Sequence, residues 1–106
     1  MPRSARNDGE WSKALAAFRS AEAEVRGFER ATAGSSAEAE EIWLPVYEAR
    51  LEALGGAVRG VMLAAAPDFA AFASKLELFF EHALEPDSAD EEIVAALRAD
   101  TRRLAR

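Results

Sequence analysis

The stretch that decides the fold is Tyr47–Ala65, which reads YEARLEALGGAVRGVMLAA. Its apolar residues recur at alternating three- and four-residue steps, namely Tyr47, Leu51, Leu54, Val58, Val61 and Ala65. This spacing places one side chain per turn on a single face, as in a helix that packs against other helices. The stretch therefore predicts an amphipathic helix.

The residues before this stretch predict a first long helix over residues 9–32. Its apolar face consists of Trp11, Leu15, Phe18, Ala21, Val25 and Phe28. Asn7 and Glu10 have the spacing of a capping box at the helix start. Gly34 supplies the stop. We expect residues 1–7 to be frayed.

The second helix is predicted to open at a capping box formed by Ser35 and Glu38 and to continue to about Ala65. Pro45 lies inside this run, where its ring lacks an amide and crowds the preceding turn. Two alternatives follow: a kink at Pro45, or a short helix over residues 37–43 that leads into the main one. Gly55, Gly56 and Gly60 have no side chains and so would allow a neighbouring helix to come close.

Two shorter helices are predicted to follow. Asp68 after Pro67 caps a helix over residues 69–84, whose expected core face consists of Phe69, Phe72, Leu76, Phe79 and Ala83, with Leu78 and Phe80 beside it. Ser88 and Glu91 form a third capping box, which opens a helix to about Arg103. Its inward residues are expected to be Ile93, Leu97 and Leu104.

Together these patterns predict an all-α fold, because no strand pattern is present. Two long antiparallel helices covered by a shorter helical hairpin form the economical arrangement, a bundle of four helices. The 106 residues are expected to make one domain, 1–106.

Composition bounds the function. The chain has no cysteine and a net charge of −6, with 25 alanines among its residues. Disulfides, thiolate chemistry and cysteine-bound zinc are excluded. The negative charge argues against direct nucleic-acid binding. No signal peptide or membrane span is expected, so we predict a cytoplasmic protein.

The region 77–92 carries seven carboxylates and no lysine or arginine: Glu77, Glu81, Glu85, Asp87, Asp90, Glu91 and Glu92. One interpretation is a surface for a basic partner, in which the carboxylates imitate nucleic-acid phosphates. The other is a solvated helix face, with acidic residues at a helix start where the dipole favours them. Glu77, Glu81 and Glu85 are the candidate partner-binding residues of this region.

Catalytic and metal-binding patterns are weak. A metal site could be drawn from Glu77, Glu81, His82 and Glu85, but Phe79 stands where a Glu-x-x-His pair needs glutamate. His82 is the sole histidine, and no serine lies in a G-x-S-x-G turn. We therefore predict no catalytic residues, no metal site, no cofactor and no enzymatic activity.

Trp43 and Tyr47 lie one turn apart beside Pro45, and both residue types are enriched at binding hot spots. They are read either as core residues that close one end of the bundle or as part of a protein interface.

Three segments resemble short helical proteins of alphaproteobacteria that have no assigned activity. They are Trp11-Ser12-Lys13-Ala14-Leu15, the stretch from Ala66-Pro67-Asp68 through Lys75-Leu76-Glu77, and Leu97-Arg98-Ala99-Asp100-Thr101-Arg102-Arg103-Leu104. The resemblance implies a small helical bacterial protein and transfers no functional residue.

The function expected from the sequence is a non-enzymatic protein–protein interaction module, such as an adaptor, an assembly component or a regulator, with a protein partner. Apolar residues off the main stripes, such as Leu44, Leu63, Leu78 and Phe80, favour self-association into a homo-oligomer. The alternative is an acidic inhibitor from a phage or mobile element that occupies a nucleic-acid-binding surface of a host protein.

Overall fold

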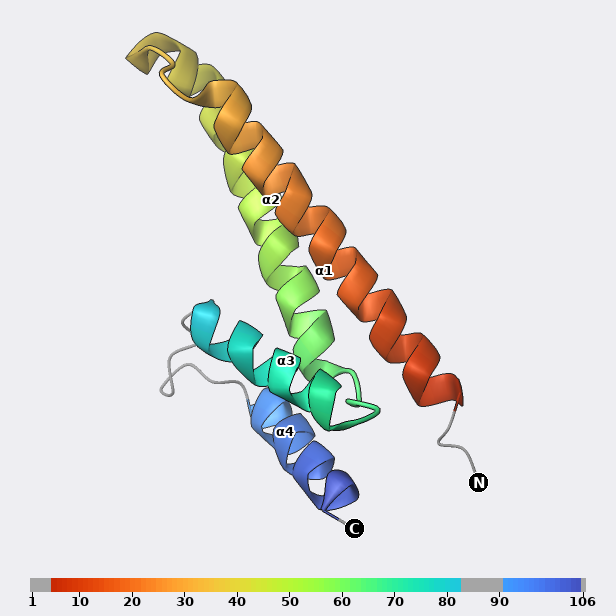
Figure 1. Ribbon diagram of the computed structural model, residues 1–106. Coiled ribbons are helices and arrows are strands. Elements are labelled where there is room, and N and C mark those ends of the chain that lie inside the picture. The colour runs from red at the N-terminus through yellow and green to blue at the C-terminus, as the bar shows by residue number, and fades with distance from the viewer. Residues whose placement is uncertain (1–4, 83–90, 106) are drawn as a thin grey trace.

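A computed structural model describes residues 5–82 and 91–105 of the chain. It contains four α-helices: α1 (Ala5–Thr32), α2 (Ala37–Leu63), α3 (Phe69–Glu81) and α4 (Glu91–Leu104), shown in Figure 1. The described residues contain no strand, and the predicted all-α fold is confirmed. None of the described helices combines the length and the apolar character that crossing a membrane would require.

Helix α1 presents the predicted face to the core. Trp11, Phe18 and Val25 are buried, and Leu15 packs against the core cluster that contains Trp11 and Phe18. The helix begins at Ala5, four residues before the predicted start, so Asn7 lies inside it and the predicted cap at Asn7 is wrong. Residues 5–7, which were expected to fray, belong to the helix, whereas residues 1–4 lie outside the described chain. The helix therefore includes Asn7, Asp8 and Gly9, although these residue types rank low in helix propensity.

The turn after α1 contains a glycine in the left-handed backbone conformation. Gly34 has a φ of 77°, the left-handed conformation that favours glycine and that commonly ends helices. Ser36, rather than the predicted Ser35, caps α2 by accepting a hydrogen bond from the amide of Ala39. The Ser35 hydroxyl instead donates to the carbonyl of Thr32 and closes the end of α1. Both serines are therefore used, one for each helix end.

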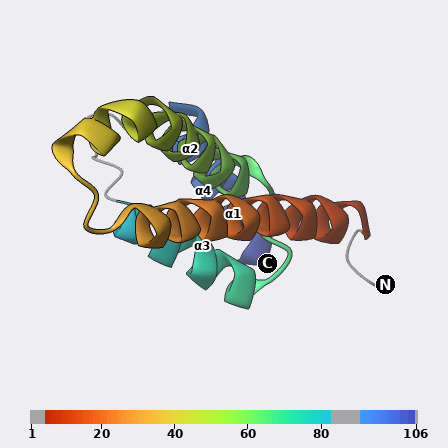
Figure 2. The same ribbon diagram turned by 90° about the horizontal axis from the view of Figure 1, so that it is seen from above.

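Helix α2 is assigned as one helix with Pro45 inside it, so no separate helix forms over residues 37–43. It returns beside α1, as the contacts between Tyr47 and Glu29 and between Arg50 and Glu24 show. The two helices make a long arm (Figures 1 and 2) in a molecule that measures 58 × 30 × 16 Å. The shorter helices α3 and α4 pack at the lower end of α2, near the chain termini.

The core lies where the four helices meet. Val58, Val61 and Met62 of α2 are buried there together with Ala66 in the following loop. Ile93 of α4 is buried and Leu97 and Leu104 pack against the core, as predicted. The upper part of the α1–α2 arm depends on contacts between those two helices alone.

Helix α3 is turned differently from the prediction. Asp68 caps it as expected, by accepting from the amide of Ala71 at 2.8 Å. Its buried residues are Ala71, Lys75 and Leu78, while Phe72 and Phe79 are only partly buried. Phe69 is 66% exposed, so the expectation that it faces the core is wrong. Ala83 lies outside the described residues.

The glycines of α2 do not mark close packing within the chain. A Cβ placed on Gly55, Gly56 or Gly60 would have no atom of the described chain within 4 Å other than the adjacent backbone of α2 itself. The interpretation that a neighbouring helix of the same chain comes close to these glycines is therefore wrong. The glycines instead leave an open strip along α2.

Candidate protein-interaction surfaces

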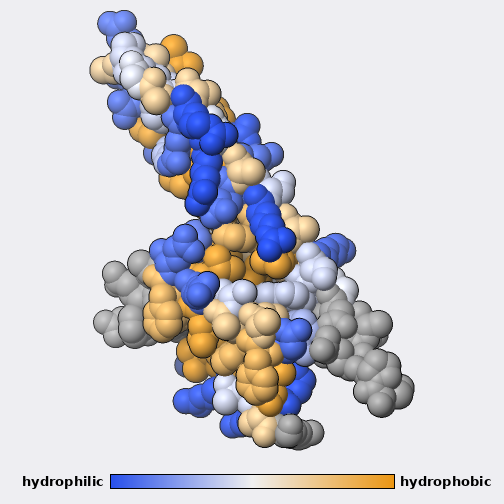
Figure 3. All heavy atoms as spheres, viewed as in Figure 1, coloured by the Kyte–Doolittle hydropathy of each residue, from blue (hydrophilic) through white to orange (hydrophobic). Residues whose placement is uncertain are grey.

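The outward side of α3 carries exposed aromatic residues. Phe69 is 66% exposed and Phe80 is 74% exposed, and Ala73 and Leu76 lie between them at four-, three- and four-residue steps. We call these four residues the α3 outer face. In Figure 3 hydrophobic residues gather over the lower part of the molecule, where α3 and α4 lie, and the upper arm is more hydrophilic. An exposed apolar cluster of this kind marks interaction sites in soluble proteins.

The predicted acidic residues border this face. Glu77 and Glu81 are both exposed and lie next to it on α3. Glu85 lies outside the described residues, as do Asp87 and Asp90. Lys75 is the sole basic residue of α3, and its side chain is fully buried. The surface of α3 that faces solvent is therefore apolar with a negative border.

A second exposed line runs along α2. Its members are separated by alternating four- and three-residue steps and are all exposed: Ile42, Val46, Ala49, Ala53, Gly56, Gly60 and Leu63. We call this set the α2 seam. Its three large members, Ile42, Val46 and Leu63, are 80%, 45% and 40% exposed. The spacing is that of a helix seam in a coiled coil.

The α2 seam differs from the line that contacts α1. The contacts to α1 come from Trp43, Tyr47 and Arg50, each one residue after a member of the α2 seam. One residue corresponds to about 100° around a helix. A helix inside a four-helix bundle has neighbours in two directions separated by about a quarter turn. Along the arm, helix α2 therefore has α1 as a neighbour on one side and a second helical surface exposed, while α3 and α4 pack at its lower end.

Trp43 and Tyr47, the predicted candidate pair, belong to an aromatic cluster on the arm. The ring of Phe28 contacts both, with centroids 5.8 Å from Trp43 and 5.9 Å from Tyr47. Arg50 lies over the Phe28 ring and bonds Glu24 at 3.1 Å. Both aromatic residues are half-buried, and the Trp43 Nε1 atom is buried without a hydrogen-bond partner. The cluster clamps α2 onto α1 at the part of the arm far from α3 and α4.

Tyr47 also forms a hydrogen bond with a charged residue of α1. Its hydroxyl donates to the carboxylate of Glu29 at 2.6 Å. This hydrogen bond raises the pKa of Tyr47 above 10.0, with further contributions from desolvation and from the negative charge of Glu29. Tyr47 thus remains a neutral donor at any physiological pH.

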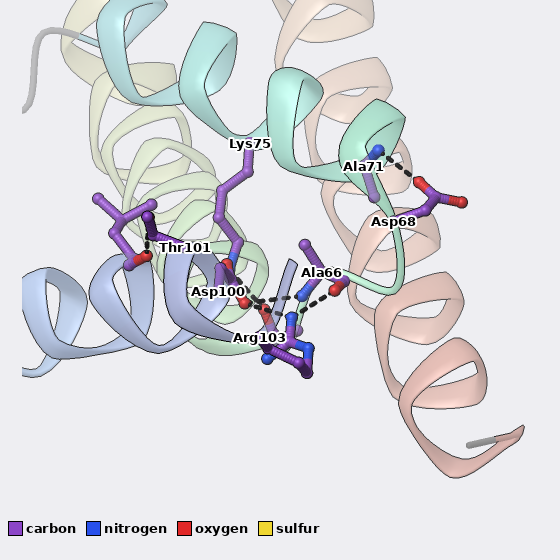
Figure 4. A network of polar contacts seen from close by, with 9 residues as sticks. Ala66, Asp68, Ala71, Lys75, Asp100, Thr101 and Arg103 are labelled. Carbon is purple, nitrogen blue, oxygen red and sulfur yellow. Dashed lines mark hydrogen bonds and ion pairs between the residues drawn. The ribbon is translucent and has the colours of Figure 1, made fainter. Parts of the chain in front are cut away.

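A buried ionic network, which the sequence did not indicate, joins α3, α4 and the loop between α2 and α3 (Figure 4). Lys75 and Asp100 are 0% and 1% exposed, and Lys75 Nζ lies 2.5 Å from Asp100 Oδ2. Lys75 also donates to the carbonyl of Ala64 at 2.6 Å. Asp100 Oδ1 accepts from the amide of Ala66 at 3.1 Å and from Arg103 at 2.7 Å. The network satisfies each charge that it buries, as the interior requires.

Arg103 completes the network by donating to the carbonyl of Ala66 as well. Burial lowers the pKa of Lys75 from its usual value, although the Asp100 carboxylate opposes this effect. The lysine makes its polar contacts within the protein, beside the Trp11 ring. This arrangement indicates a structural role in fastening α4 to the loop and to α3.

Among the described residues, the sole histidine is recorded in an aromatic contact. The ring of His82 packs edge-on against Phe18 with centroids 5.7 Å apart, and its Nε2 atom is buried without a hydrogen-bond partner. Within residues 5–82 and 91–105, no three His, Asp or Glu side chains gather as a metal site. The predicted metal candidates therefore do not converge, to the extent that the structure describes them.

One open depression of about 480 Å³ has a lining whose described residues all belong to α4: Glu91, Val94, Ala95, Arg98 and Arg102. Charges of both signs lie along it, and these described residues bring no reactive group from a second helix to it.

Sequence reasoning identified Trp43, Tyr47, Glu77 and Glu81 but missed Lys75 and Asp100. One signal was available: Lys75 lies four and three residues from Ala71 and Leu78, so it shares their face. Comparison with protein-family models, curated proteins and solved structures finds no match for this chain.

Proposed function

We propose that this protein is a non-enzymatic helical interaction module that binds a partner protein through the α3 outer face and also self-associates. The proposal places it among adaptors, assembly components or regulators. The observation that carries it is the pair Phe69 and Phe80, both more than half exposed on one line of a helix. Covering such side chains removes apolar surface from water, and this supplies affinity at about 25 cal/mol per Å² before the costs of association.

The partner is inferred to be a basic amphipathic helix. A helix fits because the α3 outer face follows four- and three-residue steps, as a helix-in-groove contact does. Positive charge fits because Glu77 and Glu81 border the face and the lysine of α3 is buried. Complementary charges speed the encounter and select against acidic partners.

Two synthetic helical peptides test this function. Both carry the same leucine heptads, one with lysine and the other with glutamate at the remaining positions, and binding is followed by fluorescence anisotropy. We expect the lysine peptide to bind, and to bind at least tenfold more tightly than the glutamate peptide. Phe80→Ser should weaken the binding at least tenfold.

The matched control is Val46→Ser, which removes an exposed apolar residue from α2 instead. It should leave peptide affinity unchanged. Circular dichroism checks that both variants keep their helices. Equal affinity in the wild type and Phe80→Ser would exclude the α3 outer face as the binding site.

The alternative function, an acidic inhibitor from a phage or mobile element, is supported by a different feature. Exposed carboxylates lie on α3 at Glu77 and Glu81, and α2 adds a further exposed set: Glu38, Glu41, Glu48 and Glu52. Here charge rather than apolar area would supply the affinity. If Glu77→Lys/Glu81→Lys abolished binding to a basic groove while Phe80→Ser did not affect it, this second function would be favoured.

A further inference from the structure

The α2 seam points to a specific self-association geometry. We propose that two copies of this chain pair through their α2 seams as an antiparallel, two-fold symmetric dimer. This inference rests on the self-association in the proposed function and adds the surface, the direction and the register. The copies meet on α2, away from the α3 outer face.

The seam is free to receive a helix. All seven of its residues are exposed, and beyond the adjacent backbone of α2 itself no described atom lies within 4 Å of a Cβ placed at Gly56 or Gly60. The seam extends over residues 42–63, or about 32 Å of helix. Alanine and glycine in its centre let two backbones come close, and Ile42, Val46 and Leu63 supply larger side chains towards the ends.

The charges beside the seam select a second copy of the chain as its occupant. Glu52 and Arg59 lie on the same side of α2, each one residue before a seam residue, Ala53 and Gly60. The Glu52 residue is exposed, and the side chain of Arg59 is 38% exposed. When the seams pair with Ala53 opposite Gly56 of the second copy, Glu52 comes within reach of the second copy's Arg59. The symmetry repeats this pair, so one contact gives two.

Arg59 can serve both contacts. It already bonds Glu92 of α4 at 3.0 Å. A guanidinium group has five N–H donors, so a second carboxylate can share it. The intermolecular pair therefore adds to the existing contact instead of replacing it.

The same charges disfavour other pairings. A shift of the antiparallel register that puts Ala53 opposite Ala49 of the second copy brings Glu52 near its own counterpart and Arg50 near its own. In a parallel pairing, Glu52 lies near the uncharged Ala57 of the second copy and gains no ion pair. Like charges at a neighbouring position cost free energy, and thereby specify one register. In the favoured register Val46 packs on Leu63 and Ala49 on Gly60 of the second copy.

Helix α1 leaves room for this pairing. The bond between Arg50 and Glu24 shows which side of α1 borders the seam. At three- and four-residue steps before Glu24 on that side lie Ala21, which is half-buried, and Ala17, which is exposed. These small side chains allow the α1 helices of the two copies to approach, so the two arms form a four-helix bundle.

The full-length chain is tested by size-exclusion chromatography with light scattering and by analytical ultracentrifugation. The wild type is expected to be a dimer at micromolar concentration. Ala53→Glu should raise the dimer dissociation constant at least tenfold. Its matched control, Ala23→Glu on the exposed side of α1, should leave it unchanged, and both should keep the wild-type helical content.

A charge swap tests the register. Glu52→Arg alone and Arg59→Glu alone should each weaken the dimer, and the double variant should recover at least tenfold relative to Arg59→Glu. Because the chain has no cysteine, introduced cysteines can be cross-linked without competing disulfides from native cysteines. Mixed Ala53→Cys and Gly56→Cys chains should join to each other on oxidation. Preferential joining of Ala53→Cys to itself would overturn the antiparallel direction.

The outcomes separate this inference from the proposed function. An unchanged dimer in Ala53→Glu would overturn the α2 seam as the interface, with self-association kept. A wild-type monomer at all concentrations would overturn self-association. In either case, loss of peptide binding in Phe80→Ser but not in Ala53→Glu would still support the α3 outer face.

Discussion

Lys75 Nζ lies 2.5 Å from Asp100 Oδ2, and neither side chain contacts solvent. The pair joins α3 to α4, and its two residues lie 25 positions apart in the chain. Charges withdrawn from water are costly unless every one is matched. The loop between α2 and α3 also stabilises the two charges. The carbonyl of Ala64 accepts a hydrogen bond from Lys75, and the amide of Ala66 donates one to Asp100.

Removing one partner of this pair should be strongly destabilising. Asp100→Ala leaves the Lys75 ammonium buried with the Ala64 carbonyl as its remaining hydrogen-bond acceptor, and should lower the free energy of unfolding by about 3–5 kcal/mol. Urea denaturation followed by circular dichroism measures this change. Asp68→Ala, at a half-buried helix cap, serves as a comparison for losing such a cap, at about 1 kcal/mol. A loss at Asp100 no larger than that at Asp68 would contradict the assignment of a buried ion pair.

The pH dependence of stability should reveal the lowered pKa of Lys75. Between this lowered value and the usual 10.5, the unfolded chain holds a proton that the folded chain has released. Stability contributed by the group therefore rises with pH in that window. We expect the difference in unfolding free energy between the wild type and Lys75→Met to be constant near neutral pH. It should move in favour of the wild type as pH approaches 10.5, and movement in the other direction would contradict the prediction.

Tyr47 allows a direct titration because it is the sole tyrosine of the chain. Ultraviolet difference absorbance should give a pKa above 10.0 in the wild type, since the hydroxyl donates to Glu29. Glu29→Gln should lower this pKa towards the usual value by removing the negative charge. Glu24→Gln, which affects Arg50 on the same arm, is the control and should shift it less. Equal values in all three proteins would exclude the contact in solution.

The open glycines of α2 should be replaceable with a gain in stability. Gly55 lies in a helix interior where, beyond the adjacent backbone of α2 itself, no described atom lies within 4 Å of its added Cβ. Gly55→Ala is expected to stabilise the fold by about 0.5–1 kcal/mol, because alanine loses less backbone entropy on folding. Gly34→Ala is the contrasting variant and should destabilise, since its φ of 77° is strained for alanine. Thermal unfolding distinguishes the two signs.

The predicted helix ends show what local sequence can determine. Gly34 and Asp68 act as expected because their chemistry concerns the adjacent backbone: a positive φ in one case and a bond to the amide of Ala71 in the other. The cap predicted at Asn7 was wrong, since nothing in the local pattern excludes a longer helix. The sequence analysis chose Ser35 as the cap of α2, whereas in the structure the adjacent Ser36 accepts the hydrogen bond from the amide of Ala39.

The buried face was predicted correctly for α1 but not for α3. On α1 the stripe through Trp11, Phe18 and Val25 was confirmed, since large apolar residues there lie on one side. On α3 nearly every side is apolar, so periodicity could not choose between the face of Phe69 and the face of Leu78. Lys75 lies on the second face, and it can be buried there because Asp100, on a distant helix, supplies the opposite charge.

The sequence by itself determined that this protein is all-α, where α1 ends and α3 begins, and which side of α1 and α4 is apolar. These properties depend on interactions within about four residues, which the order of the side chains contains. Only the tertiary structure decided that Lys75 is buried, that Phe69 and Phe80 are exposed, and that α2 keeps an open seam beside its contact with α1. Each of these depends on which distant helix occupies the space next to a residue, and that depends on how the whole chain packs.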